Sequence, residues 1–203
     1  MNRLTMTAAT TTIAAVLLVL AAVPAHAASA CDDEAPTITG TNAGETIEGT
    51  SGDDVILALG GNDTIVGNGG NDVVCGGAGN DTITTAGGKD VVVGNSGNDT
   101  IRTASGNDRI TGGDGNDRIV AGSGDDRVTG GSGNDTVLGQ AGKDVVRGGD
   151  GVDVIRGNSG DDKLFGGSAP DTISGGAGDD YISGGPAPDR ISGGSGHNRV
   201  REN

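Results

Sequence analysis

Aliphatic residues recur at every ninth position along most of this chain. Eighteen such positions run from Ile47 to Val200, and each of them holds Ile, Val or Leu. The residues beside these positions are polar or mixed. An apolar residue between two such neighbours is typical of a short strand that buries one side chain. The spacing therefore predicts one short strand in each nine-residue unit.

A series of aspartates runs in phase with the aliphatic residues, two positions ahead of them. Glu45 precedes this series in the same register, and Asn198 follows it. Gly stands two residues before nearly every aspartate, and mostly also four and five residues before, where it permits positive φ and close backbone approach. The six residues that end in each aspartate are therefore predicted to form a turn. We call the sixteen members register aspartates: Asp54, Asp63, Asp72, Asp81, Asp90, Asp99, Asp108, Asp117, Asp126, Asp135, Asp144, Asp153, Asp162, Asp171, Asp180 and Asp189.

The repeat changes the meaning of an unusual composition. The chain has 203 residues with 42 Gly and 1% aromatic residues, which is too few large side chains for a conventional globular core. Such a composition is otherwise typical of disorder. A strand and a turn in each unit make two units one coil of eighteen residues. We therefore expect an all-β fold, a parallel β-roll (β-solenoid) of about nine coils, roughly 40 Å long at ~4.8 Å per strand.

One unit shows the pattern in full. Residues 112–120 read Gly-Gly-Asp-Gly-Asn-Asp-Arg-Ile-Val, which resembles the GGxGxDxUx nonapeptide of the RTX (repeats-in-toxin, hemolysin-type calcium-binding) family. The resemblance extends over residues from about 45 to 203. It implies a parallel β-roll that holds Ca²⁺ between successive turns on each edge. It also implies that aspartate carboxylates and turn carbonyls are the ligands.

The charge pattern agrees with a metal. Turns eighteen residues apart stack on the same edge, so the register aspartates form two columns of eight like charges. Neighbours near 5 Å repel by ~1 kcal/mol in water and more at lower dielectric. Aspartates that cap turns without metal are the alternative, but a hard divalent cation reverses this repulsion, and oxygen ligands favour Ca²⁺ over Zn²⁺. Seven gaps in each column predict at most about fourteen Ca²⁺, and folding that depends on them.

Some turns depart from the pattern. Ala169-Pro170 and Ala187-Pro188 precede their aspartates in place of Gly and a polar residue. Other turns lack the usual glycine pair, and we expect weaker or altered calcium sites at all of them. The pairs that replace it are Ala58-Leu59, Thr85-Ala86 and Thr103-Ala104.

The first thirty residues differ from the rest. Arg3 precedes an apolar stretch over residues 13–23, and Pro24 precedes Ala25-His26-Ala27, an order typical of a secretory signal peptide. A transmembrane anchor is the alternative, although the apolar run is short for a span. The expected organisation is a signal peptide at residues 1–30, cleaved after Ala27 or Ala30, a cap segment at 31–44 and the β-roll at 45–203. The mature protein is expected to be secreted.

Two cysteines bear on the start of the roll. Cleavage after Ala30 would leave Cys31 first, as in a lipoprotein, but an exported chain with only Cys31 and Cys75 most simply forms one disulfide. The outward positions of the first coils form an apolar patch that should be covered. We expect residues 31–43, including Ile38, to cover this patch and cap the first coils. The patch comprises Val55, Leu57, Val73, Cys75, Val91 and Val93.

The remaining residues limit the possible functions. His197 is the one histidine beyond the expected signal peptide. No catalytic Ser-His or Cys-His pair is therefore available, and we do not expect an enzyme. A net charge of −15 argues against a nucleic-acid partner. We expect a structural or cell-surface role, in which the partners are calcium and a cell-envelope polymer or another surface protein.

Two more specific roles remain open. An adhesin-like or ice-binding solenoid would need a regular Thr ladder, but Arg118, Val154 and Arg190 interrupt the one formed by Thr64, Thr82, Thr100, Thr136 and Thr172. Calcium-dependent binding of anionic wall polymers would use the outward basic residues of later coils. The alternative for these residues is a solvated face that balances the acidic edges. They are Arg109, Arg127, Arg147, Lys163, Arg199 and Arg201.

Overall fold

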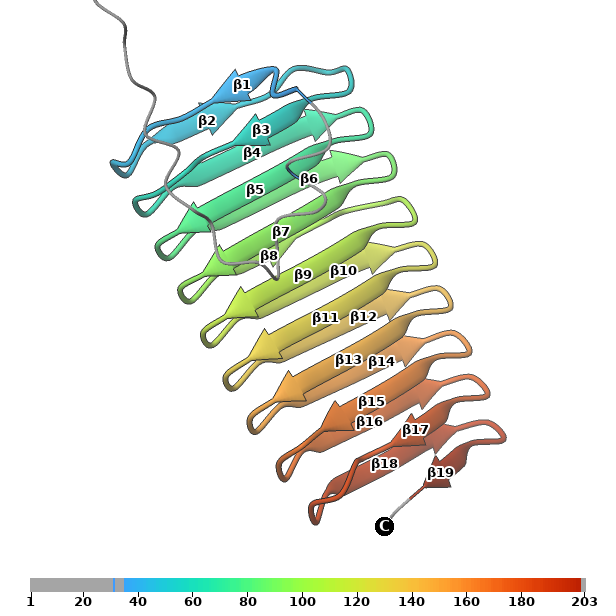
Figure 1. Cartoon of the computed structure of the whole chain (residues 1–203). Coiled ribbons are helices and arrows are strands. Elements are labelled where there is room, and N and C mark those ends of the chain that lie inside the picture. Colours follow the sequence, from blue (N-terminus) through green and yellow to red (C-terminus); the bar gives the residue numbers. More distant parts are fainter. Residues whose placement is uncertain (1–30, 32–34, 202–203) are drawn as a thin grey trace, which may run out of the picture.

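The chain alternates strand by strand between two parallel sheets that lie face to face (Figure 1). The structure is a computed structural model that describes Cys31 and residues 35–201, so the expected signal peptide lies outside the described residues. The ten-stranded sheet contains β1 (Ile38–Thr39), β3 (Val55–Leu57), β5 (Val73–Ala78), β7 (Val91–Ser96), β9 (Arg109–Asp114), β11 (Arg127–Ser132), β13 (Val145–Asp150), β15 (Lys163–Gly167), β17 (Tyr181–Ser183) and β19 (Arg199–Arg201). The nine-stranded sheet contains β2 (Thr46–Glu48), β4 (Thr64–Gly69), β6 (Thr82–Gly87), β8 (Thr100–Arg102), β10 (Arg118–Ser123), β12 (Thr136–Ala141), β14 (Val154–Ser159), β16 (Thr172–Ala177) and β18 (Arg190–Ser195).

Strands pair with the equivalent residue one coil away. Ile119 of β10 lies opposite Val137 of β12, and Val128 of β11 lies opposite Val146 of β13, each eighteen residues apart. Every pairing is parallel, as expected when each coil returns to the same sheet. The predicted all-β parallel β-solenoid of about nine coils is confirmed. No helix among the described residues has the length and apolar character needed to cross a membrane.

The aliphatic series forms the core between the sheets. Its members from Ile47 to Ile182 are buried, and most are completely inaccessible to solvent. The series opens at its C-terminal end, where Ile191 is half-buried and Val200 is 41% exposed. Because each coil contributes only two such side chains, the core is one narrow ladder, and its stability depends on neighbouring coils.

The structure corrects two expectations about the local pattern. Ile38, expected to cover the outer patch, instead lies in β1, pairs with Ile56 and packs against the core ladder. The predicted eighteen strands are therefore preceded by a nineteenth, in register nine residues before Ile47. The six-residue turns were also wrong, because most strands continue through the glycine pair, as in β9 (Arg109–Asp114). Parallel ladder hydrogen bonds need no side chains, so glycine does not end them.

Each six-residue strand consequently turns two alternate positions toward the core. In β10 these are Ile119 and Ala121, and in β9 they are Ile110 and Gly112, although Val120 and Gly122 of β10 are buried as well. The first is the aliphatic ladder. The second lies five residues before the next register aspartate, and we call it the core-facing glycine position because glycine usually occupies it.

Candidate metal sites

The register aspartates lie on two edges of the roll, where the chain passes from one sheet to the other. The first edge leads into the ten-stranded sheet, and the second edge leads into the nine-stranded sheet. The first edge contains Asp54, Asp72, Asp90, Asp108, Asp126, Asp144, Asp162 and Asp180. The second edge contains Asp63, Asp81, Asp99, Asp117, Asp135, Asp153, Asp171 and Asp189.

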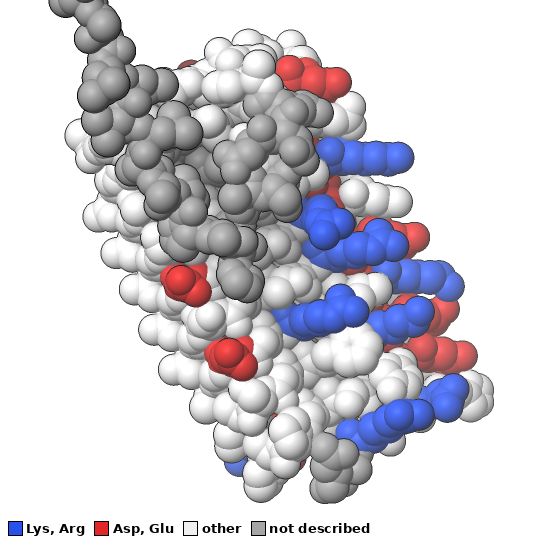
Figure 2. Space-filling model, viewed as in Figure 1, with Lys and Arg blue, Asp and Glu red and all other residues white. Residues whose placement is uncertain are grey.

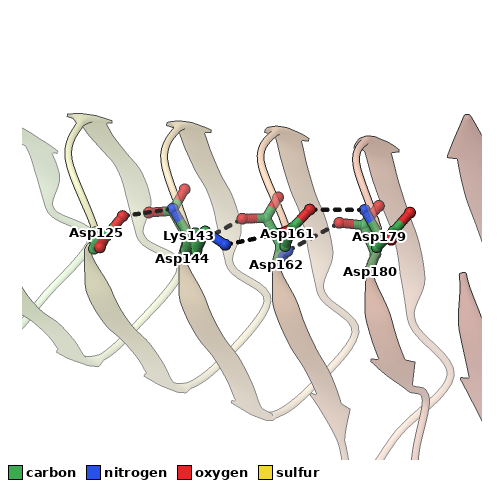
Figure 3. Close-up of polar contacts among 7 residues, drawn as sticks. All are labelled: Asp125, Lys143, Asp144, Asp161, Asp162, Asp179 and Asp180. Carbon is green, nitrogen blue, oxygen red and sulfur yellow. Dashed lines mark hydrogen bonds and ion pairs between the residues drawn. The ribbon is translucent and has the colours of Figure 1, made fainter. Parts of the chain in front are cut away.

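One oxygen of each carboxylate links successive coils. The backbone amide of Asp99 donates to Oδ1 of Asp117 at 2.7 Å, and that of Asp117 donates to Oδ1 of Asp135 at 2.8 Å. Figure 3 shows the same arrangement on the first edge, where the amide of Asp144 donates to Asp162. These bonds repeat along both edges, so every coil fixes the carboxylate of the next.

The other oxygen has no partner. Among the residues that the structure describes, Oδ2 of every register aspartate from Asp63 to Asp180 is buried without a hydrogen bond, which makes fourteen such oxygens. The aspartates themselves are almost inaccessible, at 0–2% exposure. A buried ionised carboxylate without a compensating charge costs several kcal/mol. Because this cost repeats along both edges, the buried carboxylates require a positive charge or a proton that the side chains around them do not supply.

The core-facing glycine gives this oxygen its surroundings. A Cβ built on Gly112 would lie 2.6 Å from the carbonyl oxygen of Gly130 and closer still to Oδ2 of Asp117. Carboxylate and carbonyl oxygens thus converge without a donor between them. In the described part of the chain, no three His, Cys, Asp or Glu side chains come together closely enough to hold a metal ion by themselves. A metal would therefore be held by carboxylates and backbone carbonyls together, a hard oxygen set that suits Ca²⁺.

The two ends of the series show what satisfies this oxygen when the protein supplies a donor. Oδ2 of Asp54 accepts from the Thr50 amide at 2.6 Å and from the Thr50 hydroxyl at 2.9 Å. At the other end Asn198 replaces aspartate. Its Oδ1 accepts from the amide of Asp180 at 2.9 Å, while its Nδ2 donates to the Gly194 carbonyl at 3.3 Å. At the two ends of the series, hydrogen-bond donors of the protein therefore take the place of the cation or proton that the interior coils need.

Burial has a strong effect on the acidity of the interior aspartates. Desolvation, strengthened by neighbouring carboxylates, raises the pKa of Asp117, Asp153 and Asp162 to about 7, against hydrogen bonds from the preceding coil. It raises the pKa to about 6 at a further five: Asp72, Asp99, Asp126, Asp135 and Asp144. The pKa of Asp54 is lowered instead, chiefly by the Thr50 amide. Protons and metal ions are therefore expected to compete for the interior carboxylates.

Side chains occupy the core-facing glycine position in four turns. Three of them, Ala58, Thr85 and Thr103, begin turns that were expected to be altered, and the fourth, Ala121, was missed although its departure from Gly is visible in the sequence. The residue four positions before most register aspartates has a positive φ, and this holds even for Leu59. Ala86 and Ala104 occupy the same position but do not have a positive φ. The pairing of β4 with β6 shifts by one residue here, and β8 ends early at Arg102.

The proline turns are different. Pro170 and Pro188 are exposed, and Asp171 keeps both of its ladder bonds, from the amide of Asp153 at 2.8 Å and to Oδ1 of Asp189 at 2.9 Å. Gly166 and Gly184 still hold the core-facing position. That the prolines weaken calcium sites stays a prediction, and the interior of these turns gives no reason for it.

A disulfide joins Cys31 to Cys75, with 6.4 Å between their Cα atoms. Cys75 lies in β5, so the bond attaches the segment before the roll to the outer face of the ten-stranded sheet. On this face Val55, Cys75 and Val93 are buried, at 8%, 4% and 5% exposure. The other three residues of the apolar patch, Leu57, Val73 and Val91, are half-buried, and that residues 31–43 cover the patch stays a prediction.

Among the described residues, the features of the outer faces are less regular than the two aspartate edges. The Thr column of the nine-stranded sheet begins one coil earlier than expected, at Thr46, and Arg118 interrupts it after Thr100. His197 is a turn residue whose side chain is 98% exposed and lies 3.5 Å from Asp179. The outward basic residues gather in a band along one side of the roll (Figure 2).

The family comparison agrees with this geometry. The model of the RTX calcium-binding nonapeptide repeat matches residues 39–74, 72–101, 102–137, 138–173 and 165–200. No curated protein sequence matches the chain. The matched repeats begin at the strand that the nine-residue register had missed and extend almost to the last strand.

Proposed function

Because the chain belongs to the family of RTX calcium-binding nonapeptide repeats, we propose that the sixteen register aspartates bind Ca²⁺ along both edges and that the metal completes the fold. The observation that carries this proposal is the set of fourteen buried Oδ2 atoms without a donor. Each would contribute to a site with a turn carbonyl such as that of Gly130. Up to about fourteen ions would fit this arrangement, and Ca²⁺ would supply the positive charge that the bare edges lack.

The energetics support coupled folding. Ordering about 165 residues costs more than a hundred kcal/mol of conformational entropy, and glycine raises that cost. The aliphatic ladder is narrow, and the interior carboxylates oppose folding when they are ionised. With the proposed ions bound, the same carboxylates would favour folding, and the backbone would not need to change. Calcium is therefore a folding partner of the chain rather than a ligand that a preformed site collects.

Circular dichroism during Ca²⁺ titration of the purified chain tests this proposal. We expect little β signal at pH 8 without Ca²⁺, a cooperative rise on addition and full reversal by EGTA. Mg²⁺ at equal concentration serves as the control, because it is smaller and dehydrates reluctantly. A strong β signal at pH 8 in metal-free buffer would refute coupled folding.

We further propose that residues 1–30 are a signal peptide, that 31–44 cap the roll at 45–203 and that the protein acts outside the cell. The disulfide supports this proposal because such bonds persist in oxidising compartments. It also uses the sulfur of Cys31 that a lipid anchor would need. N-terminal sequencing of exported protein should begin at Ala28 or Cys31, and an intact or blocked terminus would contradict the assignment.

The proposed role is structural rather than catalytic. A roll held by calcium presents the outer faces of its two sheets, on which equivalent residues repeat once per coil. The aliphatic ladder fills the space between the sheets. Such a molecule is suited to interactions at a cell surface. The outer face of the ten-stranded sheet shows which chemistry such an interaction would use.

A further inference from the structure

The chain's one Phe and one Tyr lie together on the outer face of the ten-stranded sheet. Phe165 of β15 and Tyr181 of β17 have ring centroids 5.9 Å apart, tilted by 50°. Both rings are half-buried, although the core contains no aromatic residue at all. Their placement therefore serves this face rather than the packing between the sheets.

Two arginines lie against these rings. The guanidinium carbon of Arg147 is 5.2 Å from the Phe165 centroid, and that of Arg201 is 5.7 Å from the Tyr181 centroid. A cation over an aromatic face is attracted to it and loses freedom of motion. The rings thus act as positioning residues that hold two guanidinium groups in fixed places on the surface.

Two further cations complete the cluster. Lys163 and Arg199 lie on either side of Tyr181 in the register of the sheet. All four basic side chains are exposed, and within residues 35–201 none of them forms an ion pair with an acidic side chain. An acidic protein with four unpaired, partly immobilised cations in one place has a surface suited to an anion. We call Arg147, Lys163, Phe165, Tyr181, Arg199 and Arg201 the aromatic-basic cluster.

We propose that the aromatic-basic cluster binds an anionic glycan, a sugar polymer that bears carboxylate or phosphodiester groups. The cluster spans four strands from β13 to β19, roughly 14 Å at ~4.8 Å per strand, which suits successive anionic groups of an extended polymer better than one small anion. Fixed guanidinium groups bind carboxylate and phosphate through paired hydrogen bonds. The arginines cover the ring faces that nucleic-acid bases would need for stacking, so a glycan is the better fit.

This inference rests on the proposed calcium-loaded fold in one respect. Without Ca²⁺ the acidic edges would repel a polyanion, whereas bound Ca²⁺ would neutralise them and leave the cluster as the dominant field. Removing residues 1–30 takes away one charged residue, Arg3, and changes the net charge from −15 to −16; fourteen Ca²⁺ would add 28 and give +12. Binding is therefore expected only in the folded, calcium-loaded protein.

The test measures binding of hyaluronan and phosphomannan to the full chain in Ca²⁺, by biolayer interferometry at about 0.15 M salt. Arg147→Gln/Arg201→Gln removes the two stacked cations. Arg109→Gln/Arg127→Gln is the matched control, because these residues are outward on β9 and β11 of the same sheet and contact neither ring. We expect the first pair to weaken binding by about tenfold or more and the control pair by less than about threefold.

Phe165→Leu separates position from charge, since it removes a stack and no cation. It should weaken binding by about threefold. Preference for one of the two glycans identifies the anion as carboxylate or phosphodiester. Equal losses in the two arginine pairs, equal binding of uncharged dextran, or tighter binding of oligodeoxythymidine would overturn the proposal. Circular dichroism of every variant with and without Ca²⁺ distinguishes these failures from a failure of calcium-dependent folding.

Discussion

The two edges of the roll share one aspartate register but differ in the residues around it. On the second edge, every turn from Asp81 to Asp189 has Gly at the core-facing position. On the first edge, three successive turns, before Asp90, Asp108 and Asp126, have Thr85, Thr103 and Ala121 there. The repeating aspartates therefore do not by themselves define equivalent sites. The residue five positions earlier decides whether there is room beside the carboxylate.

The threonines of the first edge show the consequence in their contacts. The hydroxyl of Thr103 donates to the carbonyl of Ala121, which is the kind of oxygen that a metal would use on the second edge. That of Thr85 is buried without a partner. The first edge therefore has a central block in which side-chain atoms occupy the place that carboxylate and carbonyl oxygens approach on the second edge. We expect calcium to bind the second edge in preference to this block.

The outer surfaces of the two edges differ as well. On the second edge, the residue before each register aspartate from Asp63 to Asp135 is asparagine, and these residues form a ladder in which the amide of Asn98 donates to Asn80 and that of Asn116 to Asn98, both at 2.7 Å. On the first edge a cation interrupts the ladder every third coil. Figure 3 shows one such place, where Lys143 accepts no bond from the next coil and instead reaches Asp161 with its Nζ at 2.7 Å.

The largest expected effect comes from neutralising three neighbouring aspartates on one edge. Asp99→Asn/Asp117→Asn/Asp135→Asn alters the second edge, and Asp90→Asn/Asp108→Asn/Asp126→Asn alters the same coils on the first edge. Asn keeps the Oδ1 ladder, as Asn198 shows. We expect the second-edge variant to lose about two or more bound ions beyond the first-edge variant. Equilibrium dialysis with atomic emission counts them, and equal losses would remove the distinction between the edges.

A single side chain should convert one kind of turn into the other. Gly112→Thr places a Cβ against the Gly130 carbonyl and Oδ2 of Asp117, and we expect it to destabilise the calcium-loaded roll by about 2–4 kcal/mol. Denaturant unfolding in saturating Ca²⁺ measures this loss. Thr103→Gly is the reciprocal variant, and it should gain calcium affinity without that loss. A Gly112→Thr variant as stable as the parent would contradict the proposed crowding.

Protons should replace calcium in part, most of all on the interior aspartates whose pKa is raised. The folded-state pKa of Asp117 and Asp153 is about 7 against an ordinary value of 3.8, so the metal-free fold binds more protons than the unfolded chain between these values. Its stability is therefore greatest near pH 4 and declines as pH rises through 7. Circular dichroism in metal-stripped buffer should show more β structure at pH 5 than at pH 8.

The second-edge Asn triple serves as the control for this pH dependence. It lacks three of the titrating carboxylates, so its metal-free β signal should change less between pH 5 and pH 8. A parent chain that is equally unfolded at both pH values would show that proton binding does not compensate for the buried carboxylates.

The sequence predicts most of this molecule because its repeat has no exception in the ladder or the register. Alternation of Asp and Ile at a fixed distance determines the coil length, the two edges and the direction of each side chain. The sequence could not show that the two oxygens of one carboxylate differ. Only the folded turn reveals that Oδ1 accepts a hydrogen bond and Oδ2 does not. The sequence also indicated the basic residues of the aromatic-basic cluster but not its rings, because the contacts of Phe165 with Arg147 and Tyr181 join strands that meet only in the sheet.

The smallest expected effect concerns the outer ladder of the second edge, where the asparagine series ends. The amide of Val152 donates to Asn134 at 2.8 Å, but its own side chain offers no acceptor to the next coil, and Pro170 has no N–H to donate there. Proline thus fits a place where a donor would have no partner. Pro170→Asn alone should therefore give no stabilisation, whereas Val152→Asn/Pro170→Asn restores both partners and should add about 0.5–1 kcal/mol in thermal unfolding. An equal gain from Pro170→Asn alone would instead mean that the proline strains its turn, and the second edge would then contain a weak coil after all.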